Sequence, residues 1–125
     1  KVYYTMSLYL TPHMLAAAYE YLRISRPFKG WKLPHGDEIE FCVTRHRDRS
    51  GDQSQHIAQK HFIIRVSAYH IQTTVDVMCV TAHEVVHIYQ DIRKTPRRQM
   101  HNAEFKRLWK QVCAVHGFGE KEFLE

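Results

Sequence analysis

Residues 73–91 of this 125-residue chain, TTVDVMCVTAHEVVHIYQD, decide which fold the sequence predicts. Thr73 and Asp76 fit a capping box at the start of a helix, with an acidic residue in place of the usual Glu or Gln. The residues after this cap are apolar on nearly every side of a helix: Val75, Val77, Met78, Val80, Ala82, Val85, Val86 and Ile88. A helix that is apolar all round is buried, so we expect a central helix from about Thr74 to Asp91.

An H-E-x-x-H pattern lies inside this predicted helix and is formed by His83, Glu84 and His87. Side chains four positions apart lie one above the other on a helix, so the two imidazoles can bind one tetrahedral zinc ion. Zinc lowers the pKa of a water molecule, and Glu84 can accept the proton of that water. Because two buried histidines without a partner are costly, the pattern favours a metal site over a pair of core histidines.

A catalytic zinc site needs a third protein ligand and one open position. A metzincin would have Gly and His at the positions of Gln90 and Arg93, so this class is excluded. Glu104 follows the pattern at a spacing that is short for a thermolysin-like site. His101, at the head of the last predicted helix, is therefore the expected third ligand, with Glu104 and Asp91 as alternatives.

Two segments before the central helix have the alternation of apolar and polar residues that predicts strands. They are EIEFCVT at residues 38–44 and HFIIRVSAY at residues 61–69. The polar run DRSGDQSQ at residues 48–55 is typical of a turn or loop. A weaker strand pattern follows at residues 56–60.

Amphipathic helices are predicted at both ends of the chain. The first covers residues 11–24, with Thr11 as cap and Pro12 at the first helical position. The last covers residues 102–116, and its apolar stripe is formed by Phe105, Leu108, Trp109, Val112 and Val115. The order of helix, strands, buried helix and amphipathic helix predicts the α+β class. We expect a single domain over residues 1–125, with a small β-sheet packed by the three helices.

The chain is basic, with a formal net charge of +5. Its basic residues concentrate in two segments, which can attract DNA or another polyanion and otherwise form a solvated surface. The residues concerned are Arg45, Arg47, Arg49, Arg93, Lys94, Arg97 and Arg98.

The cysteines and the hydropathy pattern bear on location. Cys42, Cys79 and Cys113 are odd in number and form no C-x-x-C pair, so a disulfide framework is not expected. No apolar run is long enough to cross a bilayer, and no stretch has the pattern of a signal peptide. We therefore expect an intracellular protein, cytoplasmic or nuclear, in a reducing compartment and without a membrane partner.

HEVVHIYQ (83–90) followed by HNAEFKRLW (101–109) resembles the SprT-like (Spartan) metalloproteases, in which H-E-x-x-H precedes H-G-x-x-F at the head of a helix. The resemblance implies a zincin-like fold, with His83, His87 and His101 as zinc ligands and Glu84 as general base. It also implies a protein or peptide substrate that lies extended along an edge strand, for which residues 61–69 are the candidates. Asn102 stands where that family usually has Gly.

Two functions follow from the sequence. The first is a zinc-dependent endopeptidase, including one that acts on DNA-bound or DNA-crosslinked proteins, as members of that family are associated with doing. The alternative is a basic nucleic-acid-binding or regulatory module with a structural or vestigial zinc site.

Overall fold

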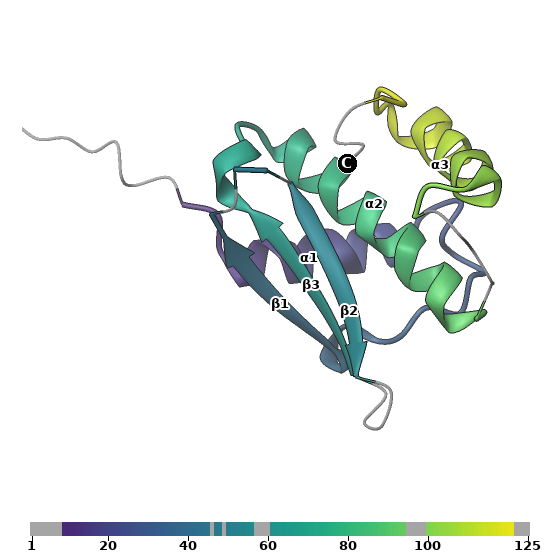
Figure 1. Cartoon of the computed structure of the whole chain (residues 1–125), viewed down its shortest axis with the longest axis horizontal. Coiled ribbons are helices and arrows are strands. Elements are labelled where there is room, and N and C mark those ends of the chain that lie inside the picture. The colour runs from purple at the N-terminus through teal and green to yellow at the C-terminus, as the bar shows by residue number, and fades with distance from the viewer. Residues whose placement is uncertain (1–8, 46, 49, 57–60, 95–99, 122–125) are drawn as a thin grey trace, which may run out of the picture.

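The structure, a computed structural model, describes residues 9–45, 47–48, 50–56, 61–94 and 100–121 (Figure 1). Three α-helices, three strands and two short 3-10 turns form this part of the chain. In order they are α1 (Pro12–Arg23), η2 (Gly36–Glu38), β1 (Ile39–Thr44), β2 (Gly51–His56), β3 (His61–Ser67), η4 (Ala68–His70), α2 (Thr74–Ile92) and α3 (Ala103–His116). The expected α+β class is confirmed.

Side-chain caps begin each α-helix where the sequence predicts them. The Thr11 side chain accepts a hydrogen bond from the Met14 amide at the start of α1. At the start of α2, Thr73 and Asp76 form the expected capping box. These side chains satisfy backbone N–H groups that the helices themselves leave unpaired, which fixes the first turn of each helix.

The sheet has the strand order β1-β3-β2, with β1 parallel to β3 and β2 antiparallel to it. The prediction of a turn or loop at residues 48–55 is therefore wrong from Gly51 onward, because β2 begins there. This strand lacks apolar alternation and pairs through its backbone with β3, so tertiary hydrogen bonding overrides the polar composition. Of the weaker strand predicted at 56–60, residues 57–60 lie outside the described part of the chain.

The position of β3 corrects a second expectation. Residues 61–69 were the candidate edge for an extended substrate, yet β3 pairs with β1 on one side and with β2 on the other. Both sets of its backbone hydrogen-bonding groups are thus engaged in the sheet. The edges of the described sheet are β1 and β2.

Helix α2 lies between the sheet and α3, as Figure 1 shows. It packs on β2 and β3 on one side and on α3 on the other, while α1 packs on β1 and α2. Most of α2 from Val77 to Gln90 is buried, in agreement with the predicted central helix.

The sequence pattern predicted two apolar side chains to be buried that are exposed, Val75 and Val115. Cys113 instead completes the buried face of α3. Within the described residues, no helix is both long and apolar enough to cross a membrane.

Candidate metal centre

Three histidine side chains converge between α2 and the start of α3. His83 and His87 come from successive turns of α2, and His101 stands two residues before α3 begins. The Nε2 atom of His83 lies 3.2 Å from Nε2 of His87 and 3.1 Å from Nε2 of His101. The structure thus brings together the three ligands that the sequence predicts.

These distances fit a small metal ion. Nitrogen atoms bound to zinc at about 2.0–2.1 Å with tetrahedral angles lie about 3.3–3.4 Å apart. Each neutral imidazole can offer one nitrogen lone pair, so three Nε2 atoms this close together can bind one cation. Imidazole binds zinc, copper, iron and nickel, so the cluster indicates a metal site without fixing which metal it takes.

The environment of His83 keeps its ring neutral, as a metal ligand must be. Burial, and then the nearby His87 and His101, lower the pKa of His83 to about 2. A neutral imidazole presents the lone pair that a metal ion binds. The Nδ1 atom of His83 is buried and has no hydrogen-bond partner among the described residues. The orientation of this ring therefore depends on packing.

Aromatic side chains of α3 supply that packing. The ring centroid of Phe105 lies 4.9 Å from that of His83, and its ring stacks on His87 at 4.5 Å. Trp109 meets the His83 ring edge-on at 5.4 Å. Phe105 also lies 4.6 Å from His101, so one buried aromatic ring contacts all three imidazoles. The apolar stripe of α3 thus orients the three histidines as well as filling the core.

A buried glutamine joins the end of α2 to the start of α3. The Gln90 side chain is 0% exposed, and its Nε2 donates to Oδ1 of Asn102 at 3.1 Å and to Oε1 of Glu104 at 3.0 Å. Asn102 also caps α3, because its Oδ1 accepts from the Phe105 amide at 2.9 Å. This network fixes the residue next to His101 and so holds the third ligand against α2. The sequence alone gave Gln90 no role beyond excluding the metzincin class.

Glu104, one alternative third ligand, belongs to this network and not to the cluster. Its Oε2 accepts a hydrogen bond from Nη1 of Arg93 at 2.8 Å. The hydrogen bond from Gln90 and the charge of Arg93 lower the pKa of the Glu104 carboxyl. The other alternative, Asp91, also lies outside the ligand group found among the described residues.

Glu84, the expected general base, is buried with an exposed fraction of 3%. It follows His83 by one residue and is therefore rotated about 100° from it around the helix axis. Its Oε2 faces the first residue of β2, since a Cβ atom added at Gly51 would lie 3.0 Å from it. The same Cβ would lie 2.9 Å from Cγ1 of Val80. Only glycine lets β2 approach α2 this closely, a role that the sequence pattern did not reveal.

The basic residues do not form one patch in the described structure. Arg45 lines a cavity with Thr73 and Thr74 at the N-terminal end of α2, whereas Arg93 and Lys94 follow its C-terminal end. A helix of 19 residues separates these ends by about 28 Å. Arg47 lies over the ring of Tyr69, and Arg93 over that of Tyr89. The remaining predicted contacts, Arg49, Arg97 and Arg98, lie outside the described residues.

No family profile matches the chain, and no curated protein is significantly similar to it in sequence.

The Gly51→Ala variant tests the close approach of β2 to α2. The added methyl group meets Val80 and Glu84, so we expect unfolding to become easier by about 1–3 kcal/mol. Gly30→Ala is the matched control, because nothing lies within 4 Å of a Cβ at Gly30. Urea unfolding of both variants measures the difference, and equal stabilities would contradict the proposed contact.

The Gln90→Met variant tests the network that holds His101. It keeps a buried side chain of similar length but cannot donate to Asn102 or Glu104, so we expect metal affinity to fall by about 10- to 100-fold. Competition with a chromogenic chelator measures this affinity. Leu22→Ala on α1 is the control, since it should lower stability without changing metal affinity. An unchanged affinity in Gln90→Met would show that the network does not position the ligand.

Proposed function

We propose that this protein is a zinc-dependent endopeptidase with a zincin-like fold. The observation that carries the proposal is the convergence of three Nε2 atoms, two from α2 and one from the segment just before α3, with the buried Glu84 next to His83 on α2. Three protein nitrogen ligands with one open position are the ligand set of a catalytic zinc site, whereas structural sites are closed by a fourth protein ligand. The resemblance of residues 83–109 to SprT-like proteases supports the same assignment.

Each residue of the site has a role in this proposal. The metal would be held by the neutral imidazole rings of His83, His87 and His101. When bound, zinc supplies a Lewis acid that acidifies water and polarises a peptide carbonyl. Glu84 accepts the proton of the attacking water and delivers it to the nitrogen of the departing amine. Burial of Glu84 against Gly51 keeps its carboxylate in one position, which general acid–base catalysis requires.

The strand proposed to pair with the substrate is β2 and not β3. Strand β2 is an edge strand of the described sheet, and its first residue lies against Glu84. An extended peptide paired with that edge would pass the glutamate and the three histidines. Backbone pairing does not depend on side-chain identity, which suits an endopeptidase acting on proteins.

DNA-bound or DNA-crosslinked proteins remain the expected substrates by family resemblance. Among the basic residues, the guanidinium of Arg93 is paired with Glu104. A polyanion could contact exposed cations at either end of α2, namely Arg45, Arg47 and Lys94. The proposed location is a reducing intracellular compartment, on the ground that the sequence has three cysteines without a C-x-x-C pair.

Metal analysis of the His101→Ala variant tests the ligand set. We expect about one zinc per chain in the parent protein. Loss of one of three ligands should weaken affinity more than the loss of a supporting residue does, hence by more than about 100-fold. Elemental analysis and chelator competition measure both quantities. If His101→Ala kept the parent affinity, the third ligand would lie elsewhere.

The Glu84→Gln variant tests the proton transfer. The amide has nearly the shape of the carboxylate but cannot accept the proton, so proteolysis should fall by about 10²- to 10⁴-fold while zinc content stays unchanged. Cleavage of an unfolded protein substrate, with and without single-stranded DNA, provides the assay. Zinc binding by a parent protein that cleaves nothing would favour the alternative of a regulatory or nucleic-acid-binding module.

A further inference from the structure

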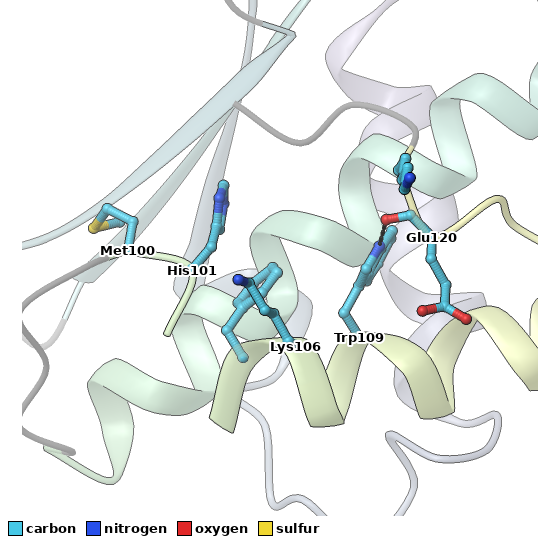
Figure 2. Close-up of a pocket in the computed structure, with 7 residues that line it drawn as sticks. Met100, His101, Lys106, Trp109 and Glu120 are labelled. Atoms are coloured by element: carbon cyan, nitrogen blue, oxygen red, sulfur yellow. Dashed lines mark hydrogen bonds between the residues drawn. The ribbon is translucent and has the colours of Figure 1, made fainter. Parts of the chain in front are cut away.

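A cavity of about 560 Å³ opens directly beside the metal centre. Met100 and His101 line one end of it, and Glu120 lies at the other end, beyond Trp109 (Figure 2). Because His101 belongs both to the cavity and to the ligand cluster, a group bound in the cavity lies next to the metal site. The cavity therefore borders the place where a substrate bond would be broken.

Two aromatic rings of the core, those of Phe105 and Trp109, lie under this cavity, with exposed fractions of 0% and 2%. Phe105 and Trp109 lie nearly parallel, with ring centroids 6.3 Å apart and an interplanar angle of 24°. The indole Nε1 of Trp109 donates to the backbone oxygen of Glu120 at 3.0 Å, so its one polar group is already satisfied. The exposed thioether of Met100 adds a flexible apolar wall. Such a lining favours a large apolar or aromatic occupant.

The rim of the cavity is positively charged. Lys106 and Lys121 contribute two cations, against the single carboxylate of Glu120. In Figure 2 the Lys106 ammonium lies between His101 and Trp109, whereas the Glu120 carboxylate points away on the other side of Trp109. An anionic group beside the apolar occupant would thus face Lys106.

We propose that this cavity is the specificity pocket of the enzyme. It takes a large apolar or aromatic side chain next to the cleaved bond and favours an acidic residue adjacent to that side chain in the substrate. Its volume is sufficient for a residue as large as phenylalanine together with part of its neighbour. The inference rests on the proposed endopeptidase function, since it assigns the pocket to that enzyme's protein substrate.

Binding to the zinc-loaded Glu84→Gln variant tests the pocket without cleavage. Four unstructured decapeptides would differ only at two adjacent positions, which read Phe-Glu, Ala-Glu, Phe-Lys and Ala-Lys. We expect the Phe-Glu peptide to bind at least about tenfold more tightly than the Ala-Glu peptide, because truncation leaves most of the cavity unfilled. Isothermal titration calorimetry gives the four dissociation constants. Equal binding of the Phe and Ala peptides would overturn the proposal.

Reversing a charge on α3 tests the preference for an acidic residue at the second variable position of the peptides. Lys106→Glu, made in the same Glu84→Gln background, should reverse the preference between the Phe-Glu and Phe-Lys peptides. Lys110→Glu is the matched control: it makes the same charge change one turn along α3, on an exposed residue that does not line the cavity. We expect it to leave the preference unchanged. If both variants shift the preference equally, the charge effect is not specific to the pocket and this part of the proposal fails.

Cleavage of the same peptides by the parent protein separates the two proposals. Cleavage that prefers Phe-Glu supports both of them. Selective binding without cleavage of any peptide would reject the endopeptidase and retain the pocket. Cleavage at equal rates for all four peptides would retain the endopeptidase and reject the pocket.

Discussion

The close approach of three imidazole nitrogens, two from α2 and one from the segment just before α3, is the arrangement on which the candidate site depends. Two of them are spaced by one turn of α2, but His101 has to be brought to them by the position of α3. His83 and His87 are buried, and Nε2 of His83 lies 3.2 Å and 3.1 Å from the other two Nε2 atoms, so a metal ion held there would connect α2 with the start of α3.

Packing and hydrogen bonding both hold the three histidines in position. Phe105 contacts all three imidazoles, so a side chain of the core stripe also sets the orientation of the ligands. Gln90 is buried between the helices and bonds to the cap residue and to the first turn of α3. A fully buried amide is stable only when its donors are satisfied. Its partners, Asn102 and Glu104, therefore have to stay on either side of the start of α3, close to His101.

Local signals predicted much of the fold because they act within a few residues. The caps at Thr11 and Thr73 and the apolar faces of the helices are set by nearest-neighbour hydrogen bonding and by the helical period. The prediction failed at β2, whose polar sequence carries no strand signal and whose conformation comes from pairing with β3. It failed again for the edge strand, since strand order is not contained in the pattern of any one strand.

The sequence by itself predicted the helix that carries His83, Glu84 and His87, from its capping box and its apolar residues. Residues four apart lie on one face of a helix, so this prediction also placed the two histidines together. It also selected His101 as the third ligand, by the position of that residue at a helix start. Only the tertiary structure decided that these nitrogens meet and that β3 is central. It alone also decided that Gly51 lies against Glu84 and that a cavity adjoins His101. These features join segments far apart in the chain, and long-range packing, which no local pattern encodes, sets their distances.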